Sequence, residues 1–197
     1  MVLLALVGVG VIGWIERRPL LQSIADAWIV SDQIAPADVV AVFGGGLEDR
    51  PFAAAYYYRK GLVRTVLLSN VHVGPAGHLG AFPTHVVAAR EILSKLGVPE
   101  SAVETFGNDL SNTHDEVLAL RAWAEHAGAR SIIVPTEIFP ARRVRWMLHR
   151  VFSEDMTIRV VALDPLEYRR DDWWQHEEGI VSLQNEILKY LYYRIRY

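Results

Sequence analysis

The chain has 197 residues, of which 51% are hydrophobic and 22% charged, and its formal net charge is −3. This length and composition are typical of one globular domain with short appendages, and the weakly negative charge argues against nucleic-acid binding. The absence of cysteine excludes disulfides and thiolate metal sites.

The N-terminus is almost wholly apolar over its first fifteen residues, and Glu16, Arg17 and Arg18 end the run. A helix of that length reaches about 22 Å, which is less than the roughly 30 Å hydrocarbon core of a bilayer. We predict a membrane anchor over residues 1–18, with a buried helix as the alternative.

The remaining chain divides into a linker and one domain. Residues 19–36 predict a short amphipathic linker helix, with Leu20 and Ile24 on one stripe and Pro36 at its end. In residues 37–197, strand patterns and amphipathic helix patterns alternate five times. This alternation predicts an α/β domain with a mainly parallel sheet and helices on both faces.

The expected elements follow one another with short connections. Strands are predicted at residues 39–43, 63–68, 103–106, 131–134 and 157–163, and helices at 51–59, 84–96, 112–127, 140–152 and 180–191. A long loop, residues 70–83, interrupts this order. Loops of this length often act as lids or binding loops.

The most informative stretch is residues 38–50, which predict a buried strand, a glycine turn and the start of a helix. The turn consists of Gly44, Gly45 and Gly46. In an open parallel sheet it would lie at the carboxyl ends of the strands, where glycine lets backbone amides approach an anion. A turn that only reverses the chain is the alternative. The chain lacks a complete dinucleotide fingerprint, a P-loop and a nucleophile elbow.

Two further segments, residues 106–116 and 136–143, also follow strands and are expected at the same edge. In the first of them, Thr113 and Glu116 match a capping box, which accounts for both residues without a ligand. Capping and ligand contact are compatible, because a hydroxyl and amides at a helix start also suit an anion.

The second segment places Arg142 and Arg143 in the first turn of a helix. Positive charge there opposes the helix dipole, by about 0.3–1 kcal/mol for each residue. A compensating negative charge is therefore expected. Glu116 or Glu137 would supply it as a structural ion pair, and a bound phosphate or carboxylate would supply it as a ligand. We adopt the bound anion as our prediction.

The histidines and the C-terminal aromatic residues carry weaker signals. His72, His78, His85 and His114 lack metal-binding spacing, so no metal site is predicted. The aromatic residues near the C-terminus are expected to pack in the core, with an aromatic belt at a membrane surface as the alternative. They are Trp173, Trp174, Tyr190, Tyr192, Tyr193 and Tyr197.

The order and spacing of several short segments within residues 37–152 match a known pattern, and the C-terminal tail matches it more loosely. They are residues 38–46 with Arg50, 97–99, 111–113 with Glu116, 139–143 with Trp146, and then Trp174, Glu186 and Lys189. In this order they resemble the YdcF/SanA/ElyC-like family, a bacterial group catalogued as a domain of unknown function. The resemblance implies a Rossmann-like three-layer α/β/α sandwich with a pocket at the glycine turn.

The resemblance also implies a ligand and a location. One member of that family is reported to bind S-adenosylmethionine, which makes it the candidate cofactor. Other members, often membrane-anchored with an extracytoplasmic domain, are tied to envelope barrier function and to peptidoglycan or surface-polysaccharide assembly. We therefore expect a single-pass inner-membrane protein with an extracytoplasmic domain, although Arg17 and Arg18 alone favour a cytoplasmic one.

The chain departs from the family pattern at three places. The family usually has histidine where Pro140 stands and glutamate where His85 or Thr84 stands. Its second strand commonly ends in Ser-Gly-Gly, whereas here Asn70 and a valine follow Ser69. If the first two positions are catalytic in relatives, this chain has lost or rearranged the reaction.

Two functions follow from these observations. The first is a domain that binds an anionic or nucleotide-like small molecule in envelope homeostasis. The alternative is a transferase or hydrolase that acts on a phosphate-bearing or lipid-linked envelope precursor, with Glu116 as the catalytic residue. The predicted ligand-binding residues are Gly44, Gly45, Gly46, Arg50, Ser69, Asn70, Ser111, Asn112, Thr113, Thr136, Arg142 and Arg143.

Overall fold

The structure is a computed structural model that describes residues 17–197. Most of the predicted anchor, residues 1–16, lies outside the described residues. Within residues 17–197, no helix combines the length and the apolar character needed to cross a membrane.

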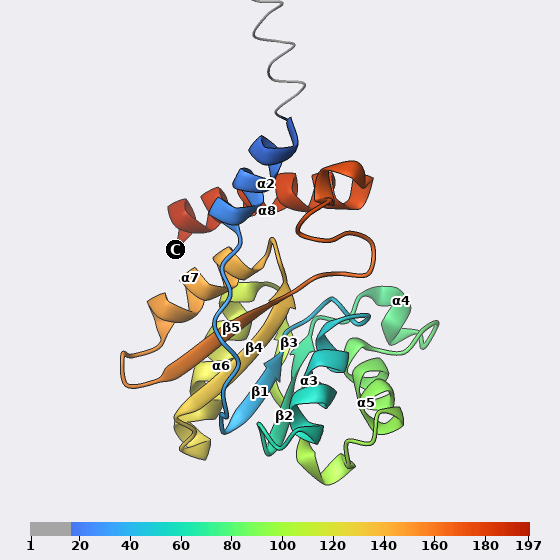
Figure 1. Ribbon diagram of the computed structural model, residues 1–197. Helices are drawn as coiled ribbons and strands as arrows, with labels where there is room; N and C mark the ends of the chain where they lie inside the picture. Colours follow the sequence, from blue (N-terminus) through green and yellow to red (C-terminus); the bar gives the residue numbers. More distant parts are fainter. Residues whose placement is uncertain (1–16) are drawn as a thin grey trace, which may run out of the picture.

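Five strands form one all-parallel sheet in the order β3-β2-β1-β4-β5 (Figure 1). Their bounds are β1 Val39–Val42, β2 Thr65–Val71, β3 Val103–Leu110, β4 Ser131–Glu137 and β5 Thr157–Leu163. The chain leaves β1 in one direction and returns to its other side as β4. This reversal is the topological switch point of a Rossmann-like sheet.

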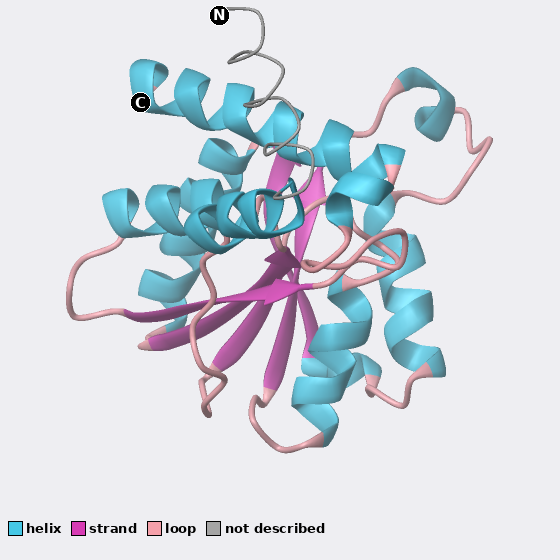
Figure 2. Ribbon diagram, turned by 45° about the horizontal axis from the view of Figure 1, so that its top comes forward, coloured by secondary structure: helices cyan, strands magenta, loops and turns pink. Residues whose placement is uncertain are grey.

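Helices cover both faces of the sheet and one of its ends (Figure 2). Their bounds are α2 Arg17–Trp28, α3 Arg50–Arg59, α4 Pro75–His78, α5 His85–Lys95, α6 Thr113–Ala127, α7 Ala141–Val151 and α8 Glu177–Arg196, with single 3-10 turns η1 Glu100–Ala102 and η2 Trp173–Gln175. Helices α3 and α5 pack on one face, and α6 and α7 on the other. The predicted three-layer α/β/α sandwich is confirmed.

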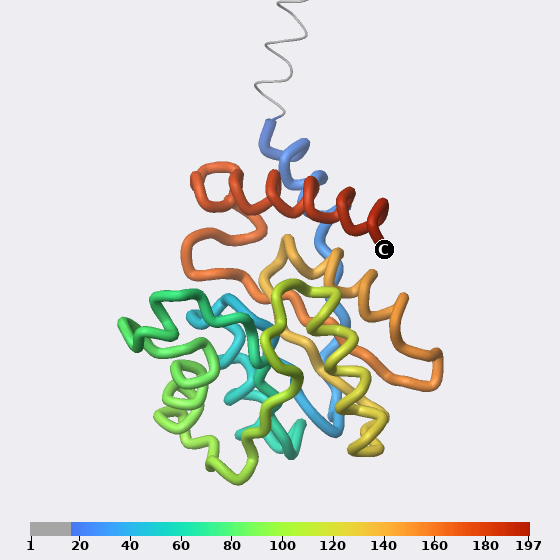
Figure 3. The backbone as a smooth tube through the Cα atoms, turned by 180° about the vertical axis from the view of Figure 1, so that it is seen from behind, coloured from blue at the N-terminus to red at the C-terminus, as the bar shows by residue number. Residues whose placement is uncertain are grey.

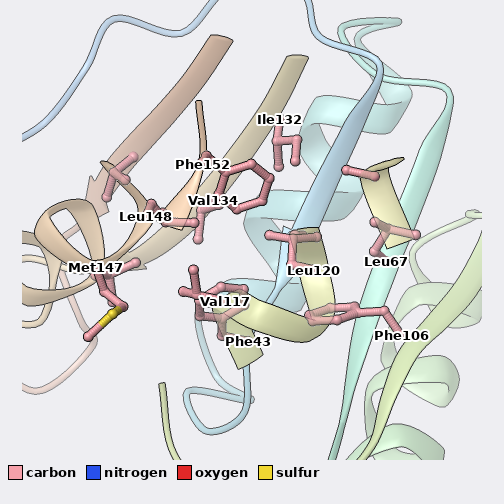
Figure 4. Close-up of a cluster of buried hydrophobic side chains, with 14 of the residues drawn as sticks. Phe43, Leu67, Phe106, Val117, Leu120, Ile132, Val134, Met147, Leu148 and Phe152 are labelled. Carbon is pink, nitrogen blue, oxygen red and sulfur yellow. The ribbon is translucent and has the colours of Figure 1, made fainter. Parts of the chain in front are cut away.

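The two faces of the sheet have separate apolar cores, because successive side chains of a strand point to opposite faces. Ala41 faces α6 and α7, where Val117 and Leu120 pack with Phe43 and Phe106 (Figure 4). Alternate residues of the same strand face α3 and α5. Burial of β1 on both faces explains its continuous apolar run.

A third cluster lies above the carboxyl ends of the strands, where α2 and α8 cross (Figures 1 and 3). Ala25 of α2 and Leu183 of α8 pack there with Phe139 and Trp173. The predicted core packing of the C-terminal aromatic residues is confirmed for Trp173 and wrong for Tyr192, whose surface is 57% exposed. The two helices therefore form a cap over one end of the sheet.

The linker helix ends at Trp28, earlier than predicted, and residues 29–36 run as an extended strap beside β5. The Asp32 amide donates to the Val160 carbonyl at 2.8 Å, and the Val160 amide donates to Asp32 Oδ2 at 2.9 Å. The Ala162 amide donates to Ser31 Oγ at 3.0 Å. These hydrogen bonds to the edge strand hold residues 31 and 32 outside the helix.

Candidate functional site

An open cavity of about 1140 Å³ lies at the carboxyl ends of β1 and β4, beneath α8. It is lined by the glycine turn, the starts of α6 and α7, and one side of α8. The expected meeting of the three predicted loop segments at one edge is confirmed. The site coincides with the switch point, where open α/β sheets bind ligands.

The glycine turn forms the floor of the cavity, and its conformation requires glycine. Gly45 and Gly46 have φ angles of 88° and 54°, which lie in the left-handed region. Within residues 17–197, the amides of Gly46, Leu47 and Glu48 form no hydrogen bond. These three residues line the cavity beside the start of α3, so their unbonded amides are candidate donors to a ligand.

Arg50 fastens the turn to β4. Its Nε and Nη2 donate to the Glu137 carboxylate at 3.0 and 2.5 Å, and its Nη1 donates to the Gly44 carbonyl at 2.6 Å. Burial alone would raise the pKa of Glu137, but the paired guanidinium more than offsets it, so the pKa lies below its ordinary value. The predicted ligand residue Arg50 is therefore already neutralised by a carboxylate.

Glu116 enters the cavity from the first turn of α6 and is 5% exposed. The Gly44 amide donates to its Oε1 at 2.6 Å. Burial raises the pKa of Glu116, and the Gly44 amide, the nearby Ser69 hydroxyl and the charges of Arg50 and Arg143 offset this effect only in part.

The predicted capping box is wrong, because Glu116 bonds to the glycine turn rather than to its own helix. Asn112 is the N-cap of α6, and its Oδ1 accepts the Asp115 amide at 3.1 Å. The Thr113 amide instead donates to the Tyr193 hydroxyl of α8 at 3.1 Å. The start of α6 is therefore bonded to the glycine turn through Glu116 and to α8 through the Thr113 amide.

Three predicted ligand residues lie beside the cavity rather than on its lining. Ser69 is fully buried, and its hydroxyl lies near the Glu116 carboxylate without a hydrogen bond of good geometry. Asn70 donates to Asn108 at 3.3 Å, and Thr136 donates to Glu137 at 3.3 Å.

Arg143 is buried and paired, with only 7% of its surface exposed. Its Nε and Nη2 donate to the Glu186 carboxylate at 2.7 and 3.0 Å, and its Nη1 donates to Thr113 Oγ1 at 2.6 Å. The expected compensating charge is therefore present. It comes from Glu186 of α8 rather than from Glu116 or Glu137.

Arg142 points away from the cavity, which corrects its placement in a joint arginine site. Its guanidinium donates to the Trp28 carbonyl at 2.7 Å and to the Ala27 carbonyl, and it lies over the Trp28 ring. These carbonyls end α2, where a positive charge is favourable. The two arginines thus diverge because they stabilise different helices.

The cavity holds an excess of carboxylates. Burial, together with Glu137 and Glu167, raises the pKa of Asp49 to about 6, so protons are retained in this negative environment. The acidic residues of the lining are Glu48, Asp49, Glu116, Glu137, Glu167, Glu178 and Glu186, against Arg50, Arg143 and Lys189. The lining therefore suits a ligand that carries cationic or hydroxyl groups besides an anionic group.

Helix α8 contributes lining residues that sequence reasoning left out of the predicted site. Ser182, Asn185 and Lys189 lie on the cavity side with Glu186 and Tyr193. Lys189 donates to Glu186 Oε1 at 3.3 Å. In the sequence these residues form a polar stripe of helical period within an otherwise apolar C-terminal segment, and that stripe could have identified them as lining residues.

Of the three departures from the family pattern, His85 contacts the glycine turn and Pro140 lies in the cavity lining. His85 Nε2 lies 3.2 Å from the Gly45 amide nitrogen and 3.3 Å from its carbonyl oxygen, and burial lowers the pKa of His85. Residues 17–197 contain no cluster of three or more histidine, aspartate or glutamate side chains placed to hold a metal.

No family model and no curated protein matches the chain. A universal stress protein in complex with cAMP is 14% identical, with a TM-score of 0.42, and the match covers 64% of this chain and 98% of that one. A Streptococcus pneumoniae protein assigned as a tRNA (m1A22) methyltransferase, in complex with S-adenosyl-L-methionine, is 16% identical, with a TM-score of 0.35. That match covers 68% of this chain and 47% of that one. Both are distant α/β neighbours.

Proposed function

We propose that this protein binds a nucleotide-like small molecule in the cavity and belongs with the YdcF/SanA/ElyC-like proteins. The proposal rests on the observation that residues of the family pattern, far apart in the sequence, line one cavity. They come from the glycine turn, from Thr113 and Glu116 of α6, from Arg143 of α7 and from Glu186 of α8. Residues that only stabilised separate helices would not need to line the same cavity.

The geometry supports a ligand with groups of both signs. Its anionic group would bind the available amides of Gly46, Leu47 and Glu48 at the start of α3, where the helix dipole adds to the attraction. Its hydroxyl or ammonium groups would bind Glu116 and Glu178. S-adenosylmethionine carries a carboxylate, an ammonium, a sulfonium and two hydroxyls, so it suits this lining better than inorganic phosphate does.

Catalysis on a phosphate-bearing or lipid-linked envelope precursor is the second candidate function. It is favoured by Glu116, because this carboxyl enters the cavity, and its burial raises its pKa, as is common for carboxyl groups that act as general acids or bases. The product of a transferase or hydrolase would appear as a changed ligand, so chromatography of the bound compound after incubation separates reaction from binding.

The proposed location is the inner membrane, with residues 1–18 as a single span and the domain extracytoplasmic. It is motivated by the apolar run of the first fifteen residues and by the family pattern. Protease added to spheroplasts should degrade the domain. If the domain is degraded only after the membrane is disrupted, the orientation is the reverse.

Calorimetric titration tests the binding proposal. We expect S-adenosylmethionine or AMP to bind the wild type, and we expect Glu116→Gln to weaken binding about tenfold, which corresponds to about 1.4 kcal/mol. Glu125→Gln makes the same chemical change on the exposed part of α6 and should leave binding unaltered. Absence of binding heat from both compounds would contradict the nucleotide-like assignment.

A further inference from the structure

Helix α8 presents an apolar stripe to solvent. Leu188 and Ile195 are 60% and 87% exposed. The stripe consists of Ile180, Val181, Ile187, Leu188, Leu191 and Ile195, which share one side of the helix at the period of 3.6 residues, and Tyr192, which also lines the cavity, lies at its border. Among these positions only Glu177 and Gln184 are polar. An ordinary surface helix would place polar residues there.

The polar side of α8 faces inward instead. Ser182, Asn185, Glu186 and Lys189 line the cavity, while Leu183 packs in the cluster shared with α2. The helix thus has a cavity side, a core side and an outer apolar side. Neither the cavity nor the core accounts for the third side.

Helix α2, which crosses α8 at the same end of the molecule, also exposes apolar side chains (Figure 1). Leu20 and Ile24 of α2 are 55% and 46% exposed. Sixteen residues precede α2, and the first fifteen of them are almost wholly apolar in sequence. The chain therefore connects this face directly to its most hydrophobic segment.

Basic residues border the face. Arg18, the second residue of α2, is exposed, and Arg194 and Arg196 lie in the last turn of α8. Apolar and aromatic side chains bordered by arginine are the composition of helices that lie in the interface of an anionic membrane.

We propose that the outer side of α8, together with Leu20 and Ile24, rests on the surface of an anionic lipid bilayer, with α8 parallel to the membrane plane. The inference rests on the proposed membrane association of the first eighteen residues. It adds that the domain is held against the lipid in one orientation. The cavity then opens beside the headgroup layer, because the outer and cavity sides are adjacent sides of one helix.

The natural absence of cysteine allows a direct test on the full chain. Single substitutions Leu188→Cys and Leu191→Cys are labelled with an environment-sensitive fluorophore and reconstituted in vesicles of equal phosphatidylcholine and phosphatidylglycerol. The matched control is Glu125→Cys, near the C-terminal end of α6 at the opposite end of the sheet. We expect blue-shifted emission at both α8 positions, quenching by nitroxide lipids and protection from aqueous iodide, and the opposite at the control.

Each other outcome overturns the proposal. Water-like emission at Leu188→Cys would mean that the domain hangs free of the bilayer. Blue-shifted emission without quenching by nitroxide lipid would mean that a second copy or the chain's own first sixteen residues cover the face. Neither labelled position lines the cavity, so titration of the same proteins with S-adenosylmethionine tests the binding proposal separately.

Discussion

At the scale of single residues, the carboxylates of the cavity fall into two groups. Glu137 and Glu186 are each paired with an arginine. Glu116 makes no ion pair within residues 17–197 and is held by the Gly44 amide. Burial without a paired cation is what raises its pKa, whereas pairing keeps that of Glu137 low.

Glu116→Gln should remove a pH-dependent loss of stability. Because the folded pKa of Glu116 is raised, protonation favours the folded state, so the stabilisation is complete below the unfolded pKa and is lost as pH rises through the folded value. Glutamine keeps an oxygen for the Gly44 amide. Urea unfolding should show that the free energy of the variant, relative to wild type, rises from pH 4.5 to pH 8. A difference that falls over this range would contradict the raised pKa.

The pair of Arg143 and Glu186 should be costly to break. Arg143→Met leaves the Glu186 carboxylate buried with only Lys189 beside it, and we expect a loss of about 3–5 kcal/mol of unfolding free energy. Arg121→Met breaks an exposed pair with Glu125 and should cost at most about 1 kcal/mol. Similar losses for the two variants, measured by urea unfolding, would argue against a buried ion pair.

At the scale of elements, the glycine turn combines a special backbone with close contacts. A methyl group on Gly46 would collide with Glu137 and approach the Arg50 side chain, and φ there is 54°. Gly61 has a similar φ of 68° but open space around it. Gly61→Ala should therefore report the backbone cost alone, about 1–2 kcal/mol.

Gly46→Ala should cost clearly more than Gly61→Ala, because it also displaces the pair of Arg50 and Glu137. Thermal melting of both variants gives the comparison. Binding of S-adenosylmethionine should be lost in Gly46→Ala and retained in Gly61→Ala. Equal melting temperatures would mean that the turn accommodates the added methyl group without displacing the pair of Arg50 and Glu137.

The local features of these elements were predictable from sequence, and their long-range partners were not. The apolar run of β1, Pro51 at the start of α3 and Pro140 before α7 set the order of the sandwich by short-range rules. Local electrostatics also predicted that Arg143 needs a negative partner. The identity of that partner depends on where α8 packs, which no local rule determines.

The predicted capping box is a second case in which a local rule missed a long-range contact. Thr113 and Glu116 have the right spacing, but Asn112 stands one residue earlier and caps the helix better through its fixed amide oxygen. Glu116 is then free to accept the amide of Gly44 from the glycine turn. A contact across the fold thus replaced the local one, and it produced the buried carboxylate of the cavity.

At the scale of the whole molecule, two segments outside the strand-helix alternation cover exposed parts of the sheet. Helix α8 covers its carboxyl end, and the strap of residues 29–36 covers the edge strand β5. Asp32→Ala should remove the acceptor of the Val160 amide and the partner of Arg145, and cost about 1–3 kcal/mol. Asp171→Ala, in an exposed pair, should change the free energy of unfolding by less than about 0.5 kcal/mol. Equal effects would mean that the strap contributes little.

The strap also bears on self-association. An open sheet has two edges whose unpaired backbone groups recruit other strands. At β3 the backbone bends through Asp109, with a φ of 55°, and its register with β2 shifts, so that edge is irregular. At β5 the strand is regular, and among residues 17–197 the strap is the segment that bonds to its free edge. A chain shortened to begin at residue 37 would leave this edge bare, and we expect it to form dimers or to precipitate through strand pairing.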